Sequence, residues 1–138
     1  STVYDINESV ASSLADELGS QAASSLTEVT AHSDVILTVV TNDAAMESIF
    51  FNDADNLFSN SSGKLFINCA TLSPKLHVRL EGAAEKIGAQ TLEGCMASSI
   101  TQAREGTLYL MIGGQEGVFN SDGLIVLMDP ITLFFFCF

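Results

Sequence analysis

One acidic side chain stands where a nucleotide-binding sheet would use it. Residues 2–6 have the apolar character of a short strand, which Asp5 interrupts and polar Asn7 closes. At the end of a parallel strand, an aspartate can accept hydrogen bonds from the two hydroxyls of an adenosine ribose, and its charge repels the extra phosphate that distinguishes NADP from NAD. The same residue could instead end the strand and cap the helix that starts at Glu8. The residues alone leave both interpretations open.

The distribution of basic residues favours NAD over NADP. Residues 1–63 contain no lysine or arginine, although an NADP site would use such a residue beside the strand that carries Asp5. The whole chain of 138 residues has 17 acidic and 5 basic residues, and its net charge is -12. This charge repels phosphate backbones and anionic lipids, so we expect no nucleic-acid binding and no binding to membrane surfaces.

The cysteines and histidines do not form a recognisable catalytic or metal site. The three cysteines, Cys69, Cys95 and Cys137, do not form a CxxC motif, and no histidine stands near any of them at the spacing of a metal site. We therefore expect reduced, buried thiols. His32 and His77 have no evident partner for proton transfer. We therefore predict no catalytic residue and no metal ligand in this chain.

Strand and helix patterns alternate along the chain. The spacing of apolar residues predicts helices over 8–18, 25–32, about 43–51 and 74–87, and strands over 2–6, 35–40, 65–67, 90–92 and 107–112. Ser25 and Glu28 form a capping-box pattern, Thr41 or Asn42 can cap the next helix, and Ser73 precedes a first-turn proline. The unbroken run from Val35 to Val40 predicts a strand that is buried on both faces. These patterns predict an α/β fold whose mostly parallel sheet is covered by helices on both faces.

Ligands of such sheets bind beyond the carboxyl ends of the strands. The candidate binding residues are therefore those that follow each predicted strand: Asp5, Ile6 and Asn7; Val40, Thr41 and Asn42; Asn68 to Thr71; and Gly94 to Ser99.

Four segments resemble the β-hydroxyacid dehydrogenase family, which includes 3-hydroxyisobutyrate dehydrogenase and relatives of 6-phosphogluconate dehydrogenase. The segments are TVYDINES, DVILTVVTNDAAMESIF, INCATLSPKLHVRLEGAAEKIGAQTLEG and QAREGTLYLMIGG, in the family's order and spacing. The resemblance covers residues 1 to about 119, and ATLSP and AREGTLYLMIGG are its most specific pieces. It implies a Rossmann-like sheet that binds NAD, or less favourably NADP, for hydride transfer to or from a small 3-hydroxy acid.

Two parts that the family requires are absent from this sequence. The resemblance implies a first strand with a GxGxxG phosphate loop upstream of Ser1, and a helical domain with a catalytic lysine in a GxxxNK-like motif. We therefore expect a partial dinucleotide-binding domain over residues 1–119 that has no meaningful turnover alone.

The resemblance also implies roles for individual residues. Val40 and Thr41 correspond to the segment beneath the adenine ribose and pyrophosphate, and Thr71 to a residue near the nicotinamide. The alternatives are a core role for Val40, a helix cap at Thr41 and loop packing at Thr71.

The segment that grips the substrate departs from the family's DAPVSGG. The matching residues here run from Glu93 to Ser99, so that the family's serine and two glycines become Ala97, Ser98 and Ser99. The hydroxyls of Ser98 or Ser99 could replace the lost contacts, although a turn that relied on glycine now costs more to form.

Residues 120–138 form an apolar tail without family resemblance. Its run from Leu124 to Phe138 is shorter than the roughly 18 apolar residues of a spanning helix and contains Asp129 and Pro130, so we expect no membrane segment. The alternative to the enzyme hypothesis is a non-catalytic interaction or regulatory module that associates through this tail with itself or with a full-length relative. In either case we expect a soluble protein of a reducing compartment, the cytoplasm or the mitochondrial matrix.

Overall fold

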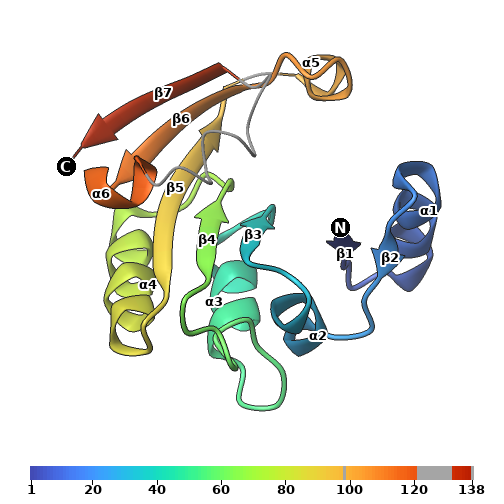
Figure 1. The fold of residues 1–138 in the computed structure, drawn as a ribbon, viewed down its shortest axis with the longest axis horizontal. Coiled ribbons are helices and arrows are strands. Elements are labelled where there is room, and N and C mark those ends of the chain that lie inside the picture. Colours follow the sequence, from blue (N-terminus) through green and yellow to red (C-terminus); the bar gives the residue numbers. More distant parts are fainter. Residues whose placement is uncertain (98, 121–131, 138) are drawn as a thin grey trace.

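The computed structural model describes residues 1–97, 99–120 and 132–137 as alternating strands and helices (Figure 1). The strands are β1 Thr2–Val3, β2 Gln21–Ala22, β3 Val35–Thr38, β4 Leu65–Asn68, β5 Gln90–Met96, β6 Tyr109–Gly114 and β7 Thr132–Cys137. The helices are α1 Glu8–Leu18, α2 Leu26–Ala31, α3 Asp43–Phe51, α4 Pro74–Lys86, α5 Ile100–Arg104 and α6 Glu116–Phe119. The predicted α/β fold is confirmed. Sequence analysis did not predict β2, β7, α5 and α6.

The strands form two separate sheets. One is the parallel pair β1 and β2, and the other has the order β3-β4-β5-β6-β7. In the larger sheet only β5 and β6 are antiparallel, so this sheet is mostly parallel, as predicted. In Figure 1, β1 lies between β2 and the larger sheet, but it is hydrogen-bonded only to β2.

Most of the predicted helix ends are confirmed, because they depend on local hydrogen bonds. The side chain of Asn42, not that of Thr41, caps α3 by accepting the N–H of Ala45 at 2.9 Å. Ser73 caps α4, which begins at Pro74, and Gly19 ends α1 in the left-handed conformation with φ of 60°.

Only one of the two hydrogen bonds of the predicted capping box at Ser25 is present. Ser25 accepts the N–H of Glu28 at 3.1 Å, but the carboxylate of Glu28 accepts the N–H and hydroxyl of Ser24 instead of returning to Ser25. A complete box forms between Ser99 and Gln102, at the start of α5.

Two hydrophobic clusters cover the two faces of the larger sheet. The first joins α2, α3 and α4 to Ile36 and Phe66, and the rings of Phe50 and Phe66 meet edge to face at 5.2 Å. Tyr4, which directly follows β1, also packs against this cluster, so the small sheet belongs to the same body. The second cluster contains Leu92 and Val118, the latter from α6. Helices therefore contribute to both faces.

The prediction that Val35 to Val40 is buried on both faces is wrong. Ile36 and Thr38 are buried, but Leu37 is 54% exposed and Val39 is 65% exposed. The physical reason is that, within the described residues, β3 is the last strand of the larger sheet and pairs with β4 alone.

The predicted division of the chain at residues 119 and 120 stays a prediction. Residues 121–131 and 138 lie outside the part of the chain that the structure describes. Beyond them, β7 adds to the sheet in parallel with β6.

Candidate functional site at the carboxyl ends of the strands

The strand register brings several predicted residues to one edge of the larger sheet. Thr38 is aligned with Asn68, and Asn68 is aligned with Glu93, so the carboxyl ends of β3 and β4 lie beside Glu93 in the middle of β5, which continues to Met96. Val40 and Thr41 follow the first of these ends, and Thr71 follows the second. This is the edge at which α/β sheets bind their ligands.

A buried hydrogen bond fixes the ends of β3 and β4. The hydroxyl of Thr38 donates to the amide oxygen of Asn68 at 2.9 Å, and both side chains are almost fully buried. Because an unpaired polar group at this depth would cost about 1–3 kcal/mol, the pair holds the two strand ends in one relative position. The segments that carry Thr41 and Thr71 therefore start from fixed points.

Asp5 is exposed at the start of the segment between β1 and α1. Its Oδ1 accepts the N–H of Asn7 at 2.8 Å, and the side chain of Asn7, rather than that of Asp5, caps α1 by accepting the N–H of Ser9. The alternative in which Asp5 caps this helix is therefore wrong. Ile6 is 89% exposed, so its side chain does not contribute to the hydrophobic core.

Val40, Thr41 and Thr71 have different surroundings. Val40 is half-buried and packs against the first hydrophobic cluster. Thr41 is exposed, and its hydroxyl accepts a hydrogen bond from the side chain of Asn42 at 3.4 Å. Thr71 is exposed as well, in a segment that Asp43 holds by accepting the N–H of Ser73 at 3.0 Å. Hydrogen bonds from this serine lower the pKa of Asp43, so its carboxylate is charged at neutral pH.

The structure assembles a polar cluster that sequence analysis missed. Nε2 of His77 on α4 lies 3.4 Å from Oε1 of Glu93 on β5, and the thiol of Cys95 donates to the same oxygen at 3.4 Å. The approach satisfies the distance of an ion pair, but Nε2 of His77 is buried without a hydrogen bond. That His77 has no partner for proton transfer stays a prediction, because its Nε2 forms no hydrogen bond within the described residues. The carboxylate that approaches it lies on another element, which spacing along the chain does not reveal.

The thiols of this edge are poor nucleophiles. Burial, together with the hydrogen bond and the charge of Glu93, raises the pKa of Cys95, and a hydrogen bond from Thr71 offsets only part of this effect. Burial raises the pKa of Cys69 to about 11. Both thiols are therefore protonated at neutral pH, which agrees with the expectation of reduced, unreactive cysteines.

The predicted substrate-gripping residues follow β5. The N–H of Ala97 donates to the carbonyl of Tyr109 at 3.0 Å. The hydroxyl of Ser99 is engaged in the capping box of α5, where it donates to Gln102 at 3.2 Å. Ser98 lies outside the described residues.

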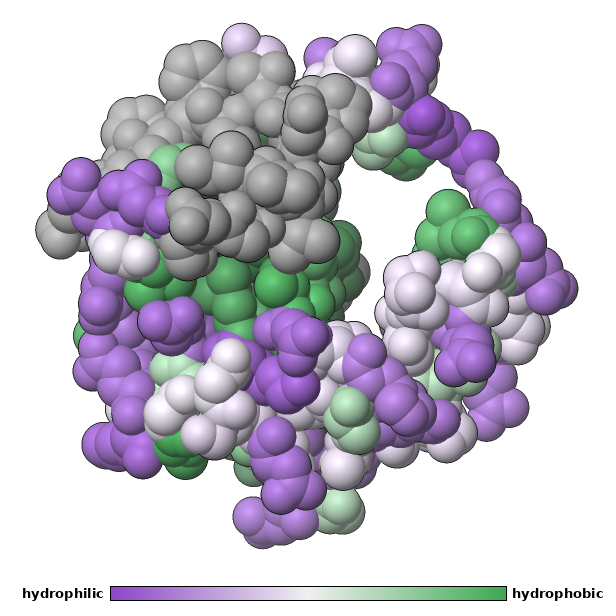
Figure 2. All heavy atoms as spheres, in the orientation of Figure 1, coloured by the Kyte–Doolittle hydropathy of each residue, from purple (hydrophilic) through white to green (hydrophobic). Residues whose placement is uncertain are grey.

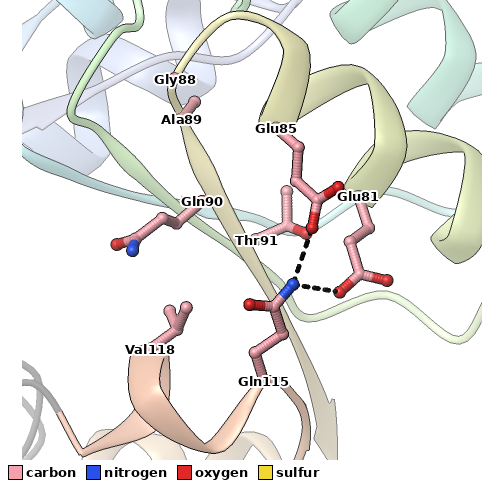
Figure 3. Close-up of a pocket in the computed structure, with 8 residues that line it drawn as sticks. All are labelled: Glu81, Glu85, Gly88, Ala89, Gln90, Thr91, Gln115 and Val118. Carbon is pink, nitrogen blue, oxygen red and sulfur yellow. Dashed lines mark hydrogen bonds between the residues drawn. The ribbon is translucent and has the colours of Figure 1, made fainter.

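A cavity of about 290 Å³ lies at the opposite end of β5, between α4 and α6 (Figure 3). In Figure 3, the side-chain amide of Gln115 points at two carboxylates, and it donates to Glu81 at 3.3 Å and to Glu85 at 2.7 Å. These bonds tie α6 to α4. Because its acidic lining repels phosphates and it lies away from the carboxyl ends, we do not assign the nucleotide to this cavity.

The described residues offer neither a cluster of metal ligands nor a membrane-spanning helix. They contain no cluster of three or more histidine, cysteine or acidic side chains that could hold a metal ion. Among the helices in the described ranges, none is both long and apolar enough to cross a membrane.

The fold and its carboxyl edge are those of a Rossmann-like, dinucleotide-binding α/β domain. The chain belongs to the family described as the NAD binding domain of 6-phosphogluconate dehydrogenase, which matches residues 1–126. The match confirms the family that the four sequence segments indicated.

Individual proteins of known function or structure are also similar to this chain. The chain is 29% identical over 110 residues to 2-hydroxy-3-oxopropionate reductase of Escherichia coli, covering 78% of this chain and 38% of the relative. It is 29% identical over 117 residues to mouse mitochondrial 3-hydroxyisobutyrate dehydrogenase, covering 85% and 35%. The solved structure of Psf3 in complex with NADP+ and 2-OPP superposes with a TM-score of 0.88 at 16% identity, over 99% of this chain and 48% of that one. The chain thus spans little more than a third of the length of these two curated relatives.

Proposed function

We propose that this chain provides the cofactor-binding part of an NAD-dependent oxidoreductase that transfers a hydride between NAD and a small 3-hydroxy acid. The observation that carries the proposal is the family match over residues 1–126, on a sheet whose carboxyl edge gathers the predicted binding segments. The two curated relatives described above are named for such chemistry, a hydroxy-oxopropionate reductase and a hydroxyisobutyrate dehydrogenase.

The adenosine end of NAD fits the exposed carboxylate of Asp5. One oxygen of this carboxylate holds the N–H of Asn7, and the side chain is otherwise open to solvent, so it is available to the ribose hydroxyls. The absence of lysine and arginine from residues 1–63 supports NAD over NADP. In this proposal Ile6, Val40 and Thr41 line the adenosine and pyrophosphate, and Thr71 lies near the nicotinamide.

The reacting end of the site depends on groups that this sequence does not contain. NAD supplies the hydride chemistry, and the protein must orient the nicotinamide and the substrate. Ala97, Ser98 and Ser99 occupy the positions that hold the substrate carboxylate in the family, but the hydroxyl of Ser99 already caps α5. With neither a GxGxxG loop nor a GxxxNK-like lysine in the sequence, we expect no turnover by these 138 residues alone. Reduced-nicotinamide absorbance with a panel of 3-hydroxy acids tests this, and clear turnover by the purified chain contradicts it.

Calorimetric titration with NAD tests the cofactor assignment. Asp5→Ala removes the hydrogen bonds that the ribose hydroxyls would donate to a charged carboxylate, which are worth about 1.5–3 kcal/mol, so we expect NAD affinity to fall about ten- to hundredfold. Asp53→Ala is the matched control, because Asp53 is an exposed aspartate in the segment after α3. Equal affinity of the Asp5→Ala variant and the unchanged chain removes Asp5 from the site, and tighter binding of NADP than of NAD refutes the cofactor preference.

The alternative is an interaction module that self-associates through residues 120–138. The parallel pairing of β7 with β6 gives part of this tail a place within the chain's own sheet, which favours the first proposal. Sedimentation over a range of concentrations separates the two, since a module of this kind forms dimers that are lost when residues 120–138 are removed. We place either protein in the cytoplasm or the mitochondrial matrix, and fractionation of cells that express it checks this.

A further inference from the structure

Two short connections at the carboxyl edge carry three of the residues that we propose as NAD contacts. The first connection, residues 39–42, leads from β3 to α3 and contains Val40 and Thr41. The second connection, residues 69–73, leads from β4 to α4 and contains Thr71. Because β3 and β4 are parallel neighbours, the two connections leave the sheet side by side, and each ends at the first turn of a helix.

Hydrogen bonds hold the two connections together where they leave the sheet. The N–H of Cys69 donates to the carbonyl of Thr38 at 2.9 Å, and the hydroxyl of Thr38 donates to the amide oxygen of Asn68, also at 2.9 Å. Thr38 and Asn68 are almost fully buried, so water does not compete for the bond between their side chains. The starting points of both connections are therefore fixed relative to each other.

A single carboxylate joins the two connections again at their helix ends. Asp43, the first residue of α3, accepts the N–H of Ser73, the N-cap of α4, at 3.0 Å. Hydrogen bonds from the hydroxyl and the N–H of Ser73 lower the pKa of Asp43, so the carboxylate remains a charged acceptor at neutral pH. Thr41 lies two residues before Asp43, and Thr71 lies two residues before Ser73. The bond between Asp43 and Ser73 therefore closes a ring of backbone that contains both threonines.

The side chains of the first connection contribute little to the core. Val39 is 65% exposed and Thr41 is exposed, whereas Val40 is half-buried against the first hydrophobic cluster. Figure 2 shows hydrophobic surface beside β3, so apolar side chains remain uncovered at this place. Because burial holds this connection weakly, the hydrogen bonds at its two ends determine where Thr41 lies.

We propose that Asp43 is a positioning residue of the cofactor site, whose bond to Ser73 fixes the separation of Thr41 and Thr71 before NAD binds. This inference rests on the proposed function, because the two threonines are contacts of NAD only in that proposal. Asp43 acts through the backbone of the two connections and need not touch the cofactor. Contacts that are already in place spare NAD the loss of entropy that ordering them would cost, so the bond raises the affinity.

Calorimetric titration with NAD compares two substitutions of Asp43. Asp43→Ala removes the acceptor, so NAD must order the two connections itself, and we expect the affinity to fall about three- to tenfold. Asp43→Asn keeps an oxygen that can accept the N–H of Ser73, so we expect its affinity to stay within about twofold of that of the unchanged chain. If Asp43→Ala does not fold, Asp43→Ser takes its place, because it lacks a carboxylate but keeps a polar residue in the first turn of α3.

Asp55→Ala is the matched control for a purely structural role. Asp55 accepts the N–H groups of Leu26 at 2.8 Å and Thr27 at 2.9 Å, so it also joins segments that are far apart in the sequence, but these segments carry no proposed NAD contact. We expect this variant to lose stability in urea and to keep its affinity for NAD. An equal loss of affinity in Asp43→Ala and Asp55→Ala, or no loss in Asp43→Ala, overturns the proposal. An Asp43→Asn variant that binds as weakly as Asp43→Ala overturns it as well.

Amide hydrogen exchange without NAD separates a failure of this inference from a failure of the proposed function. We expect the amide of Ser73 to exchange at least about tenfold faster in Asp43→Ala than in the unchanged chain, and at the unchanged rate in Asp55→Ala. If the unchanged chain binds no NAD, the proposed function fails. Equal exchange of the Ser73 amide in Asp43→Ala and the unchanged chain means that the bond does not order the second connection, which overturns the role of Asp43 whether or not NAD binds.

Discussion

Adding a single methyl group at Gly94 tests how tightly the carboxyl half of β5 is packed. A Cβ at this position would lie 2.9 Å from Cγ2 of Ile67, 3.4 Å from the sulfur of Cys69 and 3.5 Å from Cδ1 of Ile112. The first distance is well below the roughly 3.5–4.0 Å of an ordinary carbon contact. Ile67 is buried on the neighbouring strand, and its Cγ2 is attached directly at the β-carbon, so it cannot turn away freely. We expect Gly94→Ala to lower the free energy of unfolding by about 1–3 kcal/mol.

Urea denaturation measures this change against a matched control. Gly82 lies within α4, and a Cβ there would meet no atom within 4 Å, so Gly82→Ala should raise the free energy of unfolding by about 0.5–1 kcal/mol through helix propensity. The two substitutions are chemically identical and should have opposite signs, with an unchanged dependence on urea concentration. A Gly94→Ala variant that is as stable as the unchanged chain refutes the packing argument.

Two further predictions concern titrating groups. Burial alone would raise the pKa of Asp55, but hydrogen bonds from the N–H of Leu26 and from the N–H and hydroxyl of Thr27 lower it overall. The charged carboxylate of Asp55 therefore stabilises the fold fully above its pKa in the unfolded chain, about 3.9, and this stabilisation is lost as the pH falls below that value. We expect the difference in the free energy of unfolding between the unchanged chain and Asp55→Ala, measured by urea denaturation, to shrink from pH 7 to about pH 2. A constant difference contradicts this. With a pKa of about 11, only about a thousandth of Cys69 is thiolate at pH 8, so peptide mapping after iodoacetamide treatment should find Cys69 modified in urea but not in the folded chain. Equal modification in both would show that the thiol is accessible and ionised.

Sequence patterns predicted what short-range interactions decide. The cap at Asn42 and the start of α4 at Ser73 and Pro74 depend on hydrogen bonds and backbone angles within three or four residues, so the residues that decide them are adjacent in the sequence. The resemblance of the four segments to a known family added a Rossmann-like sheet, which periodicity alone does not give.

The errors have a common physical origin in contacts between distant segments. The run from Val35 to Val40 has the composition of a covered strand, but its exposure depends on whether another strand lies beside β3, and the described chain supplies none. The approach of His77 to Glu93 joins α4 to β5, elements whose relative position no local pattern encodes. The apolar composition of residues 35–40 does not reveal by itself that this strand is exposed. Recognising this requires the position of β3 in the sheet, which the structure supplies.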